Sequence, residues 1–177
     1  EAGETERAEK HLERARSLFP ENGEAGSPYP LLAQIHEERG EPERAAVELQ
    51  KFVDLNENHY DAHLKLFEIY QKLGKTGEAA SILERAIAIY PFDADAHRKL
   101  AALYQELGRK KDVVVERKAL LALTTDRAQG LYDLALAYYE AGDAGSAKRE
   151  LLRALELAPG FKDGLALLMK LSAGSGR

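Results

Sequence analysis

The five histidines are the first candidates for metal binding or acid–base chemistry, because the sequence contains no cysteine. His63 and His97 are 34 residues apart, and His59 lies four residues before His63. Zinc needs several ligands within about 2.0–2.1 Å, and no third ligand follows at helical spacing. The run HEERG at His36 lacks the second histidine of the HExxH zinc helix. The sequence therefore predicts no metal site.

Other catalytic motifs are equally missing from the sequence. There is no glycine-rich phosphate loop, no GxSxG elbow and no cysteine nucleophile. The adjacent carboxylates Glu37 and Glu38 fit a solvated helix face. We therefore expect a chain that is not an enzyme and that binds no cofactor.

The composition and charge of the chain limit the kinds of partner that it could bind. The 177 residues are 45% hydrophobic and 31% charged, and the common residues are helix formers. Residues 1–60 carry 14 acidic and 7 basic residues, and the rest of the chain carries 16 acidic and 18 basic residues. The sequence therefore lacks the cluster of basic residues that a nucleic-acid-binding surface needs. No apolar run reaches the length of a membrane span. A chain without cysteine or targeting segment fits the cytoplasm or periplasm, and its start at Glu1 suggests a piece of a longer protein.

A period of 34 residues organises the elements that would position any site. Small and apolar residues recur at this spacing while the charged residues between them differ. The recurring residues include glycines, tyrosines and alanines: Gly40, Gly74, Gly108 and Gly142; Tyr70, Tyr104 and Tyr138; Ala45, Ala79 and Ala147. Such self-similarity is the signature of a repeat architecture, in which neighbouring units bury each other's apolar faces.

Each unit reads as two helices. In 60–93 four apolar residues fall on one helical face: Leu66, Ile69, Tyr70 and Leu73. Gly74 is then expected to end the first helix in a left-handed conformation, and Pro91 to end the second, which begins near residue 76. Asp93 and Asn58 are the expected N-caps of first helices, and Asp143 of a second helix.

This arrangement resembles the tetratricopeptide repeat, and the fourth unit carries nearly the whole pattern: Leu131, Leu134, Ala135, Tyr138, Gly142, Ala147, Leu151, Ala154 and Pro159. The resemblance implies an all-α fold, a right-handed superhelical solenoid of antiparallel helix pairs. The expected repeats are 26–59, 60–93, 94–127 and 128–161. Residues 4–20 resemble a lone second helix, and 162–173 a lone first helix that caps the array.

The resemblance also implies a binding groove lined by the first helix of each repeat. The lining residues carried over to this chain are Gln34, Glu37, Glu38, Asp61, Leu64, Lys65, Glu68, Asp95, Arg98, Lys99, Tyr132, Leu136 and Tyr139. They run from acidic through basic to apolar. The three apolar residues either anchor a partner or lie beneath the helix at 162–173, and the sequence leaves both alternatives open.

Three departures from the repeat draw attention. Phe67 stands where the other repeats have alanine. Unit 94–127 has three successive valines and places Arg117 where leucine is expected, so we expect an altered helix register there. The segment 20–30 is rich in proline and glycine and about three residues longer than the regular connection, which predicts a longer loop.

These observations favour a non-catalytic protein-interaction scaffold that binds a peptide or a partner helix in the groove. One alternative is the C-terminal docking region of a larger bacterial protein, such as a peptidase. Another is a homodimer formed through the strongly apolar helix at 162–173. No nucleic acid and no membrane insertion is expected.

Overall fold

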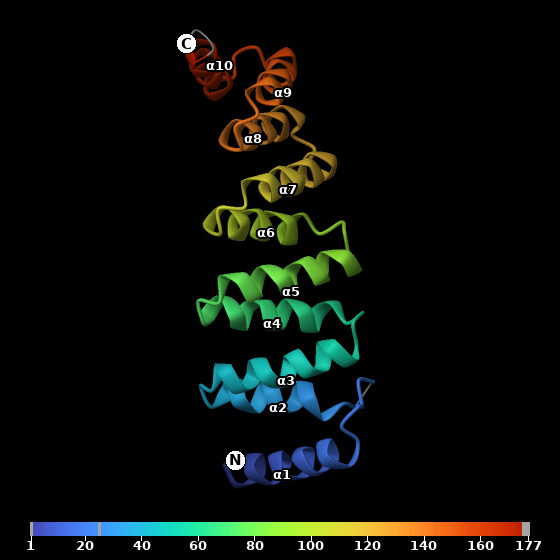
Figure 1. Cartoon of the computed structure of the whole chain (residues 1–177). Helices are drawn as coiled ribbons and strands as arrows, with labels where there is room; N and C mark the ends of the chain where they lie inside the picture. Colours follow the sequence, from blue (N-terminus) through green and yellow to red (C-terminus); the bar gives the residue numbers. More distant parts are fainter. Residues whose placement is uncertain (1, 25, 175–177) are drawn as a thin grey trace. The chain divides into compact units, whose positions relative to one another are not determined.

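The structure, a computed structural model, describes residues 2–24 and 26–174, which lie in α-helices or in the short connections between them. Ten helices lie in these residues (Figure 1): α1 Ala2–Leu18, α2 Pro28–Glu38, α3 Pro42–Leu55, α4 Tyr60–Lys72, α5 Thr76–Ile89, α6 Ala94–Glu106, α7 Lys110–Leu123, α8 Arg127–Glu140, α9 Ala144–Leu157 and α10 Lys162–Gly174. The chain divides into two compact units, one up to Pro91 with α1–α5 and one from Phe92 with α6–α10. The predicted all-α class is confirmed.

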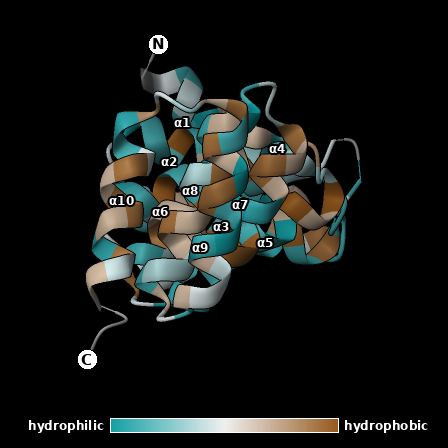
Figure 2. Ribbon diagram, turned by 90° about the horizontal axis from the view of Figure 1, so that it is seen from above, coloured by the Kyte–Doolittle hydropathy of each residue, from teal (hydrophilic) through white to brown (hydrophobic). Residues whose placement is uncertain are grey.

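Within each unit, helices adjacent in sequence pack against each other. The first unit holds the pairs α2/α3 and α4/α5, with α1 packed on α2 and α3 on α4. The second holds α6/α7 and α8/α9, with α7 packed on α8 and α10 on α9. Most helices carry both hydrophilic and hydrophobic segments (Figure 2), as expected of helices that bury one side.

The second helices keep the period without deviation. They begin at residues 42, 76, 110 and 144, and each has 14 residues. The altered register predicted for 94–127 is therefore wrong. Three valines disfavour a helix only slightly, and the burial of Val113, which is 2% exposed, outweighs that preference.

The repeated glycines end the first helices as predicted. Gly74 has a φ of 67°, a left-handed value that costs glycine little. Its N–H bonds to the carbonyl oxygen of Gln71 at 3.0 Å, and that of Lys75 bonds to the carbonyl oxygen of Tyr70 at 2.9 Å. These two bonds form a Schellman motif, which satisfies carbonyl groups at the helix end.

Two of the three predicted N-caps are confirmed. Asp93 accepts bonds from the N–H groups of Asp95 and Ala96, and Asp143 caps α9. Before α4, however, the cap is His59, whose Nδ1 accepts from the N–H of Ala62 at 3.2 Å. The predicted cap, Asn58, is therefore wrong by one residue.

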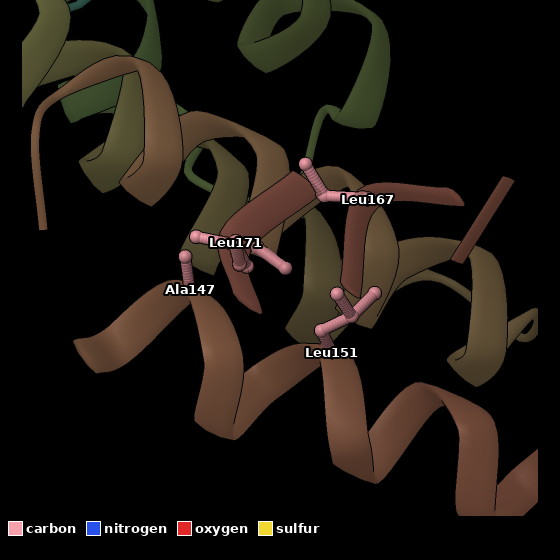
Figure 3. Close-up of a cluster of buried hydrophobic side chains, with 5 residues drawn as sticks. Ala147, Leu151, Leu167 and Leu171 are labelled. Carbon is pink, nitrogen blue, oxygen red and sulfur yellow. The ribbon is translucent and has the colours of Figure 1, made fainter. Parts of the chain in front are cut away.

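The repeated small residues form the core. Ala45, Ala79 and Ala147 are 0% exposed, and at the far end of the chain Ala147 and Leu151 of α9 pack with Leu167 and Leu171 of α10 (Figure 3). These residues therefore hold neighbouring helices together, as their recurrence predicts.

The connection between α1 and α2 ends at residue 27, so residues 28–30 of the predicted longer loop lie in α2, and the connection is attached to the helices that follow it. The hydroxyl of Tyr29 donates to the carbonyl oxygen of Pro20 at 2.6 Å, and Nδ2 of Asn56 donates to that of Gly23 at 2.8 Å. A Cβ on Gly23 would lie 2.8 Å from the Cβ of Leu55, so glycine permits this close approach. The segment thus fixes α1 beside α2, together with the ion pairs Arg39–Glu9 and Arg16–Glu48.

Candidate functional site

His63 and His97 are engaged in the scaffold. His63 is 0% exposed, and its Nδ1 donates to the carbonyl oxygen of His59 at 2.9 Å. In the second unit, Nδ1 of His97 donates to the carboxylate of Glu116 at 2.6 Å. Across residues 2–24 and 26–174, no three potential ligands are grouped to hold a metal ion. These side chains are therefore explained by packing and hydrogen bonding within their repeats.

Burial of His63 gives the protein a predicted acid sensitivity. Burial lowers the pKa of His63, although the hydrogen bond to the His59 carbonyl oxygen opposes the shift. In the unfolded chain the pKa of this histidine is about 6.5. At pH values between the lowered pKa and about 6.5, the unfolded chain therefore binds more protons than the folded protein, and the free energy of unfolding falls as the pH drops through 6.5. His63→Leu is expected to remove that loss, about 1.4 kcal/mol for each unit of pKa shift. Urea unfolding at pH 7.5 and pH 5.5 measures it.

Leu66→Val supplies the control for this experiment. Leu66 lies in the same helix and is 0% exposed, so the change loosens packing without removing a titratable group. It should lower stability equally at both pH values. An acid-induced loss that persists in His63→Leu would show that other groups cause it.

In the first unit, the predicted lining residues lie mostly at the surface. Gln34 and Glu38 of α2 are exposed and joined by a hydrogen bond of 2.9 Å. They border a shallow apolar depression between α1 and α2 of about 390 Å³. The others lie on α2 and α4: Glu37 and Leu64 are half-buried, and Asp61, Lys65 and Glu68 are exposed.

In the second unit, the predicted acidic and basic residues of α6 form one cluster. Asp95 pairs with Nζ of Lys99 at 2.8 Å and with Nη1 of Arg98 at 3.4 Å. All three side chains are exposed. The longer Arg98 contact exceeds a good hydrogen-bond length, so this guanidinium is held only loosely.

The apolar residues predicted on α8 are half-buried and contact the C-terminal segment. Tyr132 packs edge-to-face on Phe161 with 5.0 Å between ring centroids, and Nζ of Lys170 lies 5.0 Å from the ring centroid of Tyr139. Leu136 packs against the same cluster as α10. Burial, aided by nearby carboxylates, raises the pKa of Tyr132. The three side chains thus lie half-buried against the C-terminal segment, and their role as an anchor for a partner stays a prediction.

A pocket of about 150 Å³ lies between α6, α7 and α8, and we call it the Arg117 pocket. Its polar lining includes Arg98, Arg117, Gln129 and Asp133, and its apolar lining includes Leu120 and Leu121. Nη1 of Arg117 is 3.5 Å from Oδ2 of Asp133, whose Oδ1 accepts from Nε2 of Gln129 at 2.7 Å. The pocket thus offers two guanidinium groups beside an apolar wall.

The pocket arises from the departure in the third repeat. The leucines at the position of Arg117 in the other repeats, Leu49, Leu83 and Leu151, are at most 1% exposed. The Arg117 side chain is 27% exposed and reaches toward Asp133 of the next repeat. Sequence reasoning noted the arginine but missed Gln129 and Asp133, because only the packing of α8 on α7 brings them to it.

Repeated helix pairs, joined by three-residue connections that each contain a left-handed glycine, define an all-α helical-repeat protein. Two sequence models of the tetratricopeptide repeat family match residues 38–103 and 128–161, together more than half of the chain. The chain belongs to the tetratricopeptide repeat family, whose domains are generally protein-interaction scaffolds and typically non-catalytic. The resemblance predicted from the sequence is confirmed. No curated protein matches the sequence.

Solved structures share the fold at low identity. MamA is 21% identical over 84% of this chain and 81% of its own, with a TM-score of 0.57. YrrB, a TPR protein with an unusual peptide-binding site, is 17% identical over 94% and 84%, with a TM-score of 0.56. A chain of the Naa15/Naa10 complex bound to HypK-THB is 19% identical over 97% of this chain but 27% of its own, with a TM-score of 0.77. Among the described residues, no helix is long and apolar enough to cross a membrane.

Proposed function

We propose that this chain is a non-catalytic scaffold that binds a peptide or partner helix on the first helices of its repeats, and that the Arg117 pocket anchors the ligand. The observation that carries the proposal is the replacement of a core leucine by Arg117, which opens a pocket beside the predicted lining residue Arg98. Peptide binding by the structurally similar YrrB supports the ligand class. We infer that the ligand contributes an acidic side chain.

The charges of the pocket support an acidic anchor. Arg98 and Arg117 reach their present carboxylate partners only at 3.4 and 3.5 Å, beyond a good hydrogen bond. Guanidinium groups bind carboxylates with paired N–H donors, and partial enclosure strengthens the bond. Leu120 and Leu121 would contact the methylene groups of the same side chain. The proposed ligand residue is therefore a glutamate or aspartate.

Selection from a phage-displayed library of random peptides tests this proposal. We expect the immobilised protein to enrich peptides with a shared acidic residue, and Arg98→Glu to weaken their binding at least about tenfold, because it replaces attraction with repulsion. Isothermal titration calorimetry of one selected peptide measures the change. Enrichment of peptides without a shared acidic residue, bound equally well by Arg98→Glu, would contradict the anchor.

Arg117→Leu separates binding from stability. It restores the residue of the other repeats, so burial of the leucine, less a weak ion pair, should raise the free energy of unfolding by about 1–2 kcal/mol. The same change fills the pocket and should weaken the selected peptide about tenfold. Arg44→Leu is the control, since the Arg44 side chain is 67% exposed and lies on α3, a helix that contributes no residue to the pocket. Unchanged affinity in Arg117→Leu would place the ligand elsewhere.

A further inference from the structure

The last helix, α10, buries only one of its two apolar sides. Leu167 and Leu171 pack against Ala147 and Leu151 of α9 (Figure 3). On another side, Leu165 is 43% exposed and Met169 is 74% exposed. The described chain thus leaves an apolar strip open along α10.

The repeat identifies what covers this strip elsewhere. Leu131 and Ala135 of α8 lie 34 residues before Leu165 and Met169 and are only 2% and 0% exposed. Helix α8 packs on α9, the second helix of its own repeat, and Ala135 and Ala147 share one buried cluster. The open strip of α10 therefore has the position of a surface that pairs with a second helix.

Helix α1 shows the converse arrangement. Its residues Ala8 and Leu12 precede Ala79 and Leu83 of the second helix α5 by 71 residues, two periods plus the three residues of the longer loop. Ala79 and Leu83 are 0% exposed, whereas Ala8 is exposed and Leu12 is half-buried. Helix α1 packs on α2, as a second helix packs on the following repeat. The described residues therefore leave open the side of α1 that would face a first helix.

We propose that α1 of one copy packs on α10 of another copy, so that the two helices complete a repeat between chains. The open sides are opposite halves of a helix-pair interface that each chain already forms four times. A side chain as large as Met169 can be buried in such a helix pair. Phe67 of α4 has the same position in its repeat and is 1% exposed, and the second helix of that repeat carries the small residue Ala79. Each end matches the other end and not itself, so association is head-to-tail.

Sedimentation equilibrium of the 177-residue chain tests the association. The average mass should exceed the 19.6 kDa of one chain and rise with concentration. A mass of 19.6 kDa at every concentration would overturn the proposal. Neither outcome bears on the Arg117 pocket, whose residues lie on other helices.

Two end-blocked variants test the direction. Met169→Lys and Ala8→Lys each place a charge on one open side, so each alone should remain a monomer. An equimolar mixture should form a one-to-one dimer that does not grow, since each chain keeps one working end. Val115→Lys is the control: Val115 is 57% exposed on α7, and its variant should assemble like the wild type. Thermal melting by circular dichroism confirms that the variants fold.

The variants also separate the competing occupants of the strip. A symmetric dimer through α10 alone would persist in Ala8→Lys and vanish in Met169→Lys, which overturns the head-to-tail arrangement. A mixture that stays monomeric although the wild type assembles would place the contact on other surfaces and overturns it too.

Discussion

Phe67→Ala is expected to lower the free energy of unfolding by about 3–5 kcal/mol, although it restores the residue type of the other repeats. The Phe67 side chain is 1% exposed. The alanines at the same position in the other repeats are equally buried, although their side chains are much smaller: Ala33, Ala101 and Ala135 are at most 1% exposed. The helices of each repeat are therefore packed to fit the size of the side chain at this position. Removing the ring leaves a cavity that rigid helices fill only in part.

Urea unfolding followed by circular dichroism measures this effect, with hydrogen exchange to assign it to α4 and α5, because repeat arrays need not unfold in one step. The reciprocal variant Ala101→Phe should also destabilise, by about 1–3 kcal/mol, since it overfills a repeat built around alanine. If Phe67→Ala costs less than about 1 kcal/mol, the helix pair closes over the gap and the packing is not fixed repeat by repeat.

The fold was predictable because its main determinants recur. Gly74, Ala79 and Tyr70 each return at the same spacing, so helix ends and close helix contacts could be located without knowing the rest. Local preferences misled where packing decides. The valines around Val113 suggested an altered register, but burial of Val113 keeps α7 in phase. At the start of α4, His59 rather than Asn58 supplies the cap, a shift of one residue within a turn.

The site was less predictable because it depends on contacts between helices. Periodicity places Tyr132 and Tyr139 on one face of α8, yet it cannot show that Phe161 and Lys170 contact them. The sequence likewise marks Arg117 as irregular, but only the packing of α7 and α8 turns it toward Asp133. That the chain is the docking region of a larger protein stays a prediction.

His97→Leu is expected to lower the free energy of unfolding by about 3 kcal/mol, because it leaves the buried carboxylate of Glu116 without its donor. The two side chains are 7% and 10% exposed and lie 2.6 Å apart. Leucine itself is acceptable at this position, since Leu131 occupies it in the fourth repeat. There, however, the equivalent Glu150 pairs with Arg153.

Ala119 occupies the place of Arg153 in the third repeat, which makes a rescue possible. Adding Ala119→Arg to His97→Leu should recover most of the lost stability, because the arginine would pair with Glu116 as Arg153 pairs with Glu150. Urea unfolding of the two single variants and the double variant measures the coupling. If Ala119→Arg gives no more stability to His97→Leu than to the wild type, the cost arises from lost packing of the imidazole ring and not from an unpaired carboxylate.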